Sequence, residues 1–406
     1  MNKITPLAPT MSIIHHSPDP QHIFTYSPGV CVLKSGRIIA TLDTLDSRNG
    51  EKIGYIYISD DGGKSWRFVT NFPFYHARPF ISGDSVYIIG HYGKLMIIRS
   101  DDEGKTWSEA SILDENFWHQ APCNVLHTKG NVYLVMERVT EKLNVWAVSV
   151  LAPVLMRAKE GTDLLKRENW TFALEITFKS SINPEDLNYF GAPFYPFEFD
   201  KVTEVAPGRY YHPTGWLESN VVQYTDPNHI WYDEKGCTFH IWMRAHTGST
   251  NIAAMIKVVE NEDGTMTTAF EKAPTGKPIV YFPFPGGQMK FHIIYDEKTK
   301  LYWLLSTQST DSAVKAALLT KERYDLPDNE RQRLVLHFSK NCIDWVFAGL
   351  VDKGVKVCES RHYASMDILG DNLIILSRSG DENALNPHQT DMISAHKIEN
   401  FRDLVY

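Results

Sequence analysis

Five basic side chains in this 406-residue sequence each stand at the start or the end of a short β-rich run. The chain as a whole is acidic, with a formal net charge of −8, so basic residues gathered in one place would mark a specific site. Convergent cations of this kind bind carboxylate, sulfate or phosphate through charge-assisted hydrogen bonds. The predicted anion-binding set is Arg78, Arg138, Arg244, Lys290 and Arg378.

Three further residues could move protons beside these cations. We expect His119 to stay neutral near pH 7, because nearby cations disfavour its charged form, and a neutral imidazole suits a general base. Tyr363 is a possible partner, since neighbouring cations would lower the pKa of its phenol. Glu218 is either a general acid or base, or simply the counter-charge of Arg244. The polar side chains predicted to complete the substrate site are Asn220, Gln288 and His388.

No metal site and no cofactor are predicted. The five cysteines lack Cys-x-x-Cys spacing, and His15, His16 and His22 lack the spacing of metal ligands. The sequence contains neither a Gly-rich phosphate loop nor a Gly-x-Ser-x-Gly element. Its acidic balance argues against nucleic-acid binding, and no run is apolar enough to span a membrane. Because residues 1–6 contain no apolar signal region, we expect either an intracellular protein or a mature chain whose signal has been removed.

A repeated turn reveals the elements that must position these residues. Residues 59–66 read Ser-Asp-Asp-Gly-Gly-Lys-Ser-Trp, and residues 100–107 read Ser-Asp-Asp-Glu-Gly-Lys-Thr-Trp. Each copy stands between two short β-rich runs. The Asp side chains can accept hydrogen bonds from the turn backbone, Gly can adopt a positive φ, and the Trp can pack under the turn. A repeated strand–turn–strand unit indicates a modular β-sheet fold.

Strand-like runs separated by Gly turns continue along the chain and divide it into six modules. We therefore predict an all-β, six-bladed β-propeller with four antiparallel strands per blade, formed by residues 1–406 as a single domain. Within an N-terminal arm of residues 1–25, the run 12–15 could complete the last blade. Residues 180–211 fit no strand pattern and are predicted to be a long insertion near the active face, because long loops in compact domains are usually functional.

Propeller topology turns this strand assignment into a prediction of a site. The repeated turns lie between third and fourth strands, on one face of the ring. The starts of first strands and the ends of second strands therefore share the opposite face, around the central channel, where pockets form. The basic and proton-transfer residues named above occupy these places, and His388 lies in the loop that follows Arg378.

The repeated turns match the Asp-box signature, and the chain resembles the sialidase-like (neuraminidase-like) β-propellers. Several segments, among them residues 118–122 (Trp-His-Gln-Ala-Pro), 215–222 and 285–291, are similar to a subgroup related to propeller ulvan lyases and to rhamnosyl-glucuronate hydrolases of polysaccharide-degrading bacteria. In such enzymes a His and a Tyr handle protons while an Arg holds the uronate. The resemblance implies these roles for His119 and Arg244. The Arg-Ile-Pro element of true sialidases is absent from the first module.

Together, the resemblance and the basic residues predict a glycoside hydrolase or polysaccharide lyase that cleaves a glycosidic linkage in an acidic, uronate-containing glycan. In β-elimination, Arg244 and Lys290 would neutralise the carboxylate, and His119 or Tyr363 would move the protons. In hydrolysis, Glu218 or His119 would protonate the leaving oxygen. The alternatives are an exo-α-sialidase, with Tyr363 and Glu218 as its nucleophile pair, and a non-catalytic glycan-binding propeller.

Overall fold

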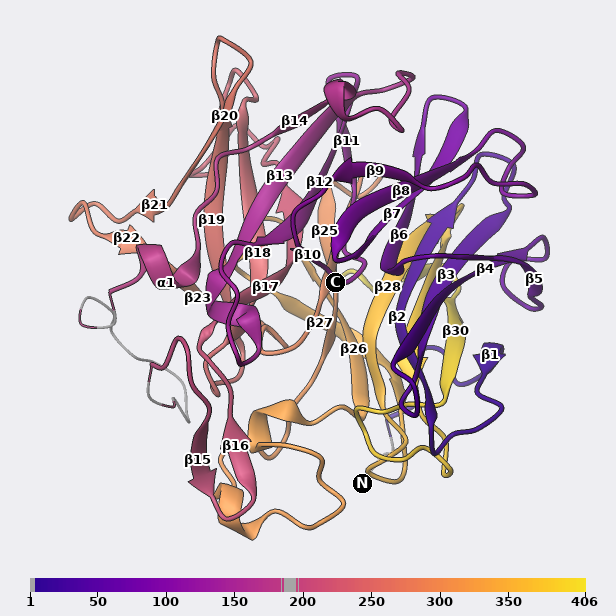
Figure 1. Ribbon diagram of the computed structural model, residues 1–406. Coiled ribbons are helices and arrows are strands. Elements are labelled where there is room, and N and C mark those ends of the chain that lie inside the picture. The colour runs from indigo at the N-terminus through magenta and orange to yellow at the C-terminus, as the bar shows by residue number, and fades with distance from the viewer. Residues whose placement is uncertain (1–3, 184, 186–194, 196) are drawn as a thin grey trace.

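The computed structural model describes residues 4–183, 185, 195 and 197–406. These residues form a six-bladed β-propeller, in which six antiparallel sheets of four principal strands follow one another around a ring (Figure 1). The predicted fold class is therefore confirmed. No helix among the described residues is long and apolar enough to cross a membrane.

The strands of each blade follow the chain from the inside of the ring outward. Blade 1 contains β2 (Ile23–Val32), β3 (Ile38–Asp46), β4 (Glu51–Ser59) and β5 (Arg67–Phe72). Blade 2 contains β6 (Tyr75–Ser82), β7 (Ser85–Tyr92), β8 (Lys94–Ser100) and β9 (Ser111–Asp114). Blade 3 contains β10 (Trp118–His119), β11 (Leu126–Thr128), β12 (Asn131–Val139), β13 (Leu151–Lys159) and β14 (Trp170–Phe172).

The second half of the ring follows the same plan. Blade 4 contains β17 (Gly215–Val222), β18 (Thr238–His246), β19 (Ile252–Glu260), β20 (Met266–Ala269) and β23 (Tyr281–Pro283). Blade 5 contains β24 (His292–Asp296), β25 (Leu301–Thr307), β26 (Arg333–Ser339) and β27 (Val346–Lys353). Blade 6 contains β28 (Arg361–Leu369), β29 (Asn372–Ser379), β30 (Met392–Ile398) and β1 (Met11–His16).

The sixth blade joins the two ends of the chain. β1 lies antiparallel to β30, with Met11 opposite His396 and His16 opposite Met392. The first strand of the sequence thus supplies the outer strand of a sheet whose other three strands come last. Because β1 pairs with β30, the sixth blade has its four strands and the ring is closed, so β30 is not left as an exposed edge.

The core is divided into apolar clusters, one between each pair of neighbouring blades. The second strand of blade 3 shows why: alternate residues of β12 face opposite sides. Leu134 and Met136 pack toward blade 2, whereas Tyr133 and Val135 pack toward blade 4. Because both faces of each sheet are covered, the inner strands read as continuous apolar runs rather than alternating ones.

A belt of hydrogen bonds from residues on or beside the first two strands of the blades crosses every boundary between blades around the ring. Its donor and acceptor groups are partly polar side chains and partly backbone carbonyls. In blade order, the bonds run from Thr41 to Ala77, Arg78 to Asn124, Asn124 to Val221, Asn220 to Phe291, Lys290 to Ala364, and Ser365 to Pro28. Adjacent inner strands do not pair with each other as a ladder, so these side chains satisfy polar groups that would otherwise be buried without partners.

The two repeated turns fold alike between the third and fourth strands of blades 1 and 2. Asp61 Oδ1 accepts hydrogen bonds from the backbone N–H groups three and four residues later, at 2.9 and 3.0 Å. Asp102 Oδ1 does the same at 3.0 and 2.8 Å. Gly63 and Gly104 adopt φ values of 87° and 81°, which only glycine reaches without strain. The Asp and Gly residues of the two turns therefore stabilise the turn backbone, and this accounts for their presence without a catalytic role.

Part of the predicted insertion, residues 184, 186–194 and 196, lies outside the described residues. Its described part contains the end of α1 (Phe178–Ser181) and a hairpin of β15 (Thr203–Ala206) and β16 (Arg209–Tyr211). Strands of four and three residues are too short to show a readable alternation, which is why the hairpin was not predicted. The hairpin and the loop of residues 308–332 lie together at the lower end of Figure 1. A further short pair, β21 (Glu271–Lys272) and β22 (Pro278–Ile279), flanks blade 4.

Candidate active site

Four of the inner strands contain the same irregularity in their first half. In each, the register with the second strand shifts at a bulge, and one non-glycine residue adopts a left-handed backbone. Such a φ costs about 1–3 kcal/mol and typically persists where function requires it. The four residues are Ser27 (φ 42°), His76 (φ 52°), Glu218 (φ 61°) and Tyr363 (φ 49°). The four residues lie on one face of the ring, opposite the face that carries the repeated turns.

Arg244, at the end of β18, joins two of these left-handed residues. Its Nη1 donates a hydrogen bond to the hydroxyl of Tyr363 at 2.8 Å and lies 3.5 Å from Glu218 Oε2. Its Nε donates to the backbone carbonyl of Gln288 at 2.8 Å, which fixes the guanidinium plane. Glu218 and Arg244 are only 2% and 4% exposed. A phenol, a carboxylate and a guanidinium from blades 4 and 6 therefore meet at one point.

Two more arginines flank the ring of Tyr363. The guanidinium carbon of Arg378 lies 5.4 Å from the ring centre, and that of Arg331 lies 5.6 Å from it. Arg331 Nη1 is also 2.9 Å from His362 Nδ1. Arg331 was not predicted, because it precedes a third strand, β26, and only first-strand starts and second-strand ends were considered. Third strands also start on this face, so the same topological rule could have found it.

Aromatic rings line this arginine group. Arg378 stacks over the ring of Tyr26 at 3.9 Å and donates a hydrogen bond to the backbone carbonyl of His388. The His388 ring in turn stacks on Tyr324, with ring centres 4.8 Å apart. Such flat, rigid surfaces suit the apolar faces of sugars as well as the cations they already contact. We call Glu218, Arg244, Arg331, Tyr363 and Arg378 the arginine cluster.

The electrostatics of the arginine cluster correct one expectation. Burial raises the pKa of Tyr363 above its ordinary value, and a hydrogen bond to Glu218 adds to the rise, although Arg244 opposes it. The prediction of a lowered phenol pKa was therefore wrong, because desolvation outweighs the nearby cations. For Arg244, burial lowers the pKa, but the charges of Tyr363 and Glu218 outweigh burial and raise it overall. A buried phenol of this kind needs a base to take its proton before it can react.

Three histidines form a second group on the same face. His91 Nε2 lies 3.3 Å from His76 Nδ1, and the ring of His119 is 6.0 Å from that of His76. Burial lowers the pKa values of His76 and His91 well below the ordinary range, so both are neutral imidazoles. His119 is more accessible, with 23% of its side chain exposed. We call His76, His91 and His119 the histidine cluster.

A fully buried carboxylate orients His119. Glu137 Oε2 lies 2.9 Å from His119 Nδ1, and Glu137 Oε1 accepts hydrogen bonds from the backbone N–H of Ser219 at 3.0 Å and its hydroxyl at 2.9 Å. The carboxylate thus holds a proton on Nδ1 and leaves Nε2 as the reactive nitrogen. Because Ser219 follows Glu218, the histidine cluster and the arginine cluster are connected through adjacent backbone.

Asp43, near the end of β3, lies beneath the histidine cluster and was also not predicted. Its Oδ1 accepts a hydrogen bond from the backbone N–H of His76 at 2.9 Å. Burial raises the pKa of this carboxyl to about 7, although that hydrogen bond and the charges of Lys52 and Arg378 oppose the rise. Asp43 lies near the end of a second strand, the kind of position from which Arg244 and Arg378 were predicted, so the same topological rule could have found it.

We expect Asp43→Asn to raise the melting temperature at pH 8.5 by a few degrees and to change it much less at pH 5. A carboxyl with a folded pKa above its unfolded value stabilises the fold fully below about pH 4, and that contribution is lost as pH rises through about 7. The neutral amide avoids the loss. Thermal melts of both proteins from pH 5 to 8.5 test this. A difference independent of pH would show that Asp43 is not the titrating group.

The other predicted binding residues use their polar atoms within the fold. Arg78 donates to the carbonyls of Asn124 and Val135, both at 3.1 Å. Lys290 Nζ donates to Ala364 at 2.5 Å, and burial lowers its pKa to about 8. Asn220 belongs to the inter-blade belt, and the Gln288 side chain bonds to the backbone of Asn251 and Thr307. Arg138 forms an ion pair with Glu175. Of the five predicted cations, the structure brings Arg244 and Arg378 together.

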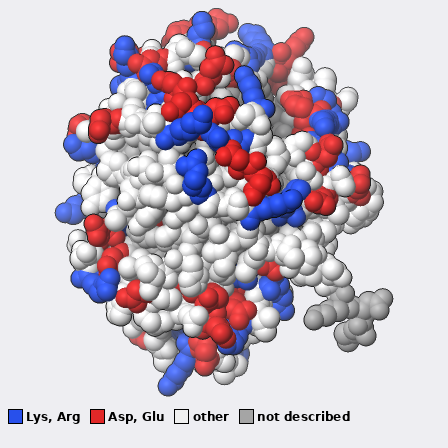
Figure 2. Space-filling view, turned by 90° about the vertical axis from the view of Figure 1, so that its right-hand side faces the viewer, with Lys and Arg blue, Asp and Glu red and all other residues white. Residues whose placement is uncertain are grey.

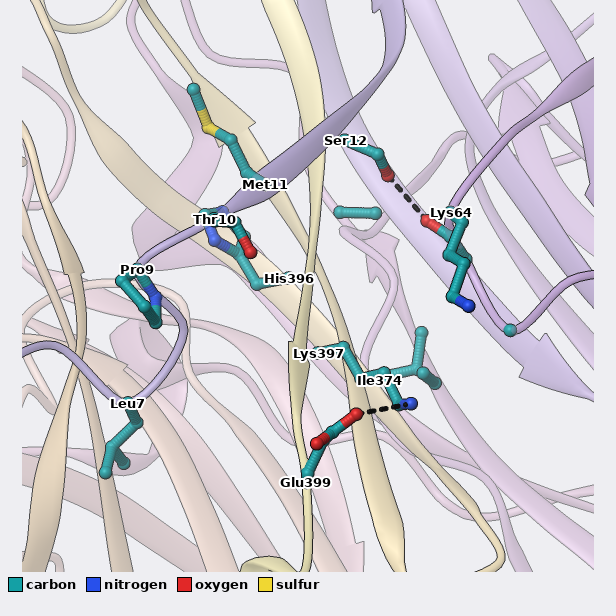
Figure 3. Close-up of a pocket in the computed structure, with 13 residues that line it drawn as sticks. Leu7, Pro9, Thr10, Met11, Ser12, Lys64, Ile374, His396, Lys397 and Glu399 are labelled. Carbon is teal, nitrogen blue, oxygen red and sulfur yellow. Dashed lines mark hydrogen bonds and ion pairs between the residues drawn. The ribbon is translucent and has the colours of Figure 1, made fainter.

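Two cavities of about 580 Å³ each differ in their relation to these clusters. The first lies between β1 and the turn at residues 62–64, and is lined by Leu7, Met11, Ser12, Lys397 and Glu399 among others (Figure 3). It contains no residue of either cluster. The second opens beside Tyr324, between the β15–β16 hairpin and residues 321–324 and 385–386. It also contains no residue of either cluster, but Tyr324, which lines it, stacks on His388 next to Arg378.

Among the residues that the structure describes, the face shown in Figure 2 has no patch of basic side chains. Acidic and basic side chains are intermixed there around a broad uncharged area. Arg244, Arg331 and Arg378 are at most 4% exposed. The positive charge of the site is therefore internal, where water screens it weakly and its interaction with an anion is stronger than at a surface.

No protein-family model matches the sequence, and no curated protein matches it. Solved structures do match. An α-L-arabinanase of Penicillium chrysogenum complexed with arabinobiose is 11% identical over 98% of this chain and 100% of that chain, with a TM-score of 0.53. A sialidase of Trypanosoma rangeli in complex with the inhibitor DANA is 11% identical over 96% of this chain and 60% of that chain, with a TM-score of 0.53. The NanB sialidase of Streptococcus pneumoniae is 11% identical over 96% of this chain and 70% of that chain, with a TM-score of 0.53. At this identity, the comparisons establish a shared propeller fold.

Proposed function

We propose that this protein is an enzyme that cleaves a glycosidic bond in a carboxylate-bearing glycan, and that the arginine cluster performs the reaction together with His119. The observation that supports this most is the meeting of Tyr363, Glu218 and Arg244, two of which adopt strained backbone conformations. The structural neighbours include an arabinanase and sialidases, which is in keeping with a glycan-cleaving role.

Hydrolysis through a covalent intermediate fits this geometry best. The Tyr363 oxygen attacks the anomeric carbon while its proton passes to Glu218, so the raised pKa of the phenol is no obstacle. The bond to the leaving oxygen breaks, and this oxygen takes a proton from His119 Nε2, so this step requires His119 to start with a proton on both ring nitrogens, a charged form that the Glu137 carboxylate stabilises. Water then attacks the same carbon, gives its proton to His119, and releases Tyr363, which recovers its proton from Glu218.

The three arginines determine the class of substrate in this proposal. Arg244 already holds Tyr363 and Glu218, whereas no carboxylate among the described residues lies within ion-pair distance of Arg331 or Arg378. Two buried guanidinium groups can together bind one carboxylate in paired hydrogen bonds. A neutral arabinan offers no such group, so we propose an acidic sugar, either a uronate or a sialic acid.

β-Elimination next to a uronate is the second candidate, and the His119–Glu137 pair favours it. An imidazole anchored by a buried carboxylate is a suitable base for the C5 proton, and Tyr363 could protonate the leaving oxygen. The resemblance to propeller ulvan lyases supports the same reading. The two candidates differ in product: elimination leaves an unsaturated sugar, and hydrolysis does not.

A panel of glycans tests the substrate class and the reaction together. We expect cleavage of at least one uronate- or sialate-containing glycan, measured as new reducing ends or released sialic acid, without ultraviolet absorbance from an unsaturated product. The matched control is the same glycan with its carboxyl groups chemically reduced to alcohols, which should be cleaved far more slowly. Rapid cleavage of arabinan or of the reduced glycan would overturn the acidic-substrate proposal, and unsaturated products would favour elimination.

A further inference from the structure

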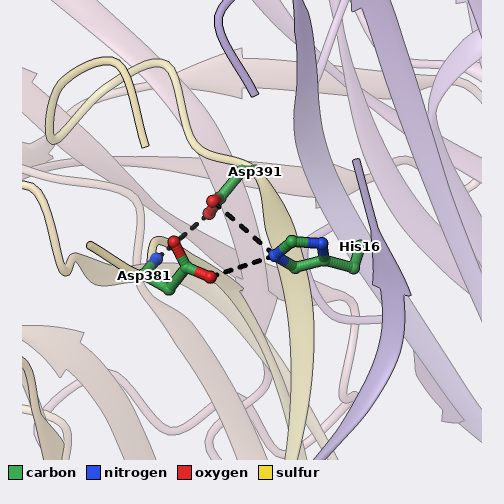
Figure 4. Close-up of side chains that lie close together, drawn as sticks. All are labelled: His16, Asp381 and Asp391. Carbon is green, nitrogen blue, oxygen red and sulfur yellow. Dashed lines mark hydrogen bonds and ion pairs between the residues drawn. The ribbon is translucent and has the colours of Figure 1, made fainter. Parts of the chain in front are cut away.

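We propose that His16, Asp381 and Asp391 bind a divalent transition-metal cation such as Zn²⁺, which fastens the N-terminal strand to the last blade. Figure 4 shows the three side chains pointing toward one another, from the end of β1, from the loop after β29 and from the residue before β30. Each offers one ligand atom, and all three atoms lie within 4.8 Å of one another. This inference is independent of glycan cleavage.

The separations suit a single small cation. His16 Nε2 lies 3.1 Å from Asp381 Oδ2 and 3.7 Å from Asp391 Oδ2. Ligands about 2.1 Å from a tetrahedral zinc ion stand about 3.4 Å from each other, so these atoms need to move little to surround one ion. One imidazole nitrogen and two carboxylate oxygens form a donor set typical of Zn²⁺ and related ions, with a fourth position left for water.

An unpartnered oxygen points independently to a ligand. The Asp391 side chain is fully buried, and its Oδ2 has no hydrogen-bond partner among the described residues. Leaving a buried carboxylate oxygen unpaired is costly, whereas a cation would satisfy it. His16 is the only basic side chain within ion-pair distance of either carboxylate in the described part of the chain.

The oxygens that do not face His16 are held by backbone groups. Asp391 Oδ1 accepts a hydrogen bond from the N–H of Asp381 at 3.1 Å, and Asp381 Oδ1 accepts one from the N–H of Asn383 at 2.6 Å. Each carboxylate is thus oriented with one oxygen fixed and the other directed at the site. Such outer hydrogen bonds are the usual support of metal ligands.

The position of the site gives the cation a structural consequence. It would link residue 16 to residues 381 and 391, at the point where β1 closes the ring against β30. It would also fix both ends of the loop of residues 380–391, which contains His388 and bonds to Arg378. The metal would therefore stabilise the closure of the propeller and the loop bordering the arginine cluster.

Zinc binding by the full-length protein tests the proposal. After removal of metals with a chelator and dialysis against micromolar Zn²⁺, we expect one zinc per chain and a melting temperature higher by a few degrees. His16→Ala should lose both effects, because His16 is 41% exposed and its removal should not prevent folding. Asp391→Asn should lose zinc as well. His22→Ala is the matched control, since His22 is also exposed and hydrogen-bonds to Asp19, yet lies outside the site.

Two results would overturn the proposal. One is the absence of retained zinc together with an unchanged melting temperature. The other is equal zinc retention by the wild-type protein and His16→Ala, which would place the ion elsewhere. Binding and stabilisation by Ca²⁺ but not by Zn²⁺ would reject the transition-metal assignment. None of these measurements depends on activity, so they stand even if the proposed glycan cleavage fails.

Discussion

Replacing Tyr363 by phenylalanine is expected to lower turnover about 10³-fold or more while leaving the propeller folded. The substitution removes only the hydroxyl that meets Arg244 and Glu218, and keeps the ring that Arg331 and Arg378 flank. Without the phenol oxygen no covalent intermediate can form. Steady-state kinetics on the acidic glycan that the panel identifies, with a thermal melt of each protein, measure the effect.

Tyr324→Phe is the matched control for this experiment. Tyr324 belongs to the same face, stacks on His388 and is 43% exposed, so loss of its hydroxyl should change turnover by only a few fold. Mass spectrometry of the wild-type enzyme, quenched during turnover, should find a sugar attached to the peptide that contains Tyr363. Near wild-type turnover of folded Tyr363→Phe would contradict covalent hydrolysis and would also exclude Tyr363 as the acid of the elimination mechanism.

The repeat architecture could be predicted from the sequence because its signals are local. Two nearly identical turns, each between β-rich runs, give both the module and its length, and the Asp and Gly residues of the turns make the bonds expected of them. The inner strands were readable as apolar runs because neighbouring blades cover both of their faces. Among the extended segments that were missed, the β15–β16 hairpin and the β21–β22 pair are too short to produce a pattern.

The division of polar residues between fold and site could not be predicted in this way. Arg78 and Lys290 stand at inner-strand starts just as Tyr363 does, yet they reach across to backbone carbonyls of the next blade. Whether a side chain reaches a neighbouring blade or a ligand depends on how far apart two inner strands lie, and the sequence does not encode that distance locally. The positions of the left-handed bulges could not be predicted from the sequence either, because the four residues that adopt this backbone share no side-chain type.

Long-range pairing limits sequence reasoning in a further way. His16 was set aside because no metal ligand lies at a suitable spacing near it, whereas its partners stand at positions 381 and 391. Only ring closure brings the two ends of the chain together. Topology also explains the partial success with the arginines: the rule that located Arg244 and Arg378 applies equally to third strands, where Arg331 lies.

His119→Ala is expected to lower turnover by about 10²–10⁴-fold, the usual contribution of a general acid or base, with little change in stability. The side chain is partly exposed and packs little apolar area, so its loss should leave the fold intact. Glu137→Gln should reduce turnover less and shift the pH profile, because the amide removes the charge that holds the proton on Nδ1. Added imidazole should restore part of the activity of His119→Ala, but not that of Tyr363→Phe. Full turnover in folded His119→Ala would remove the histidine cluster from the mechanism and leave Tyr363 and Glu218 to manage both proton transfers.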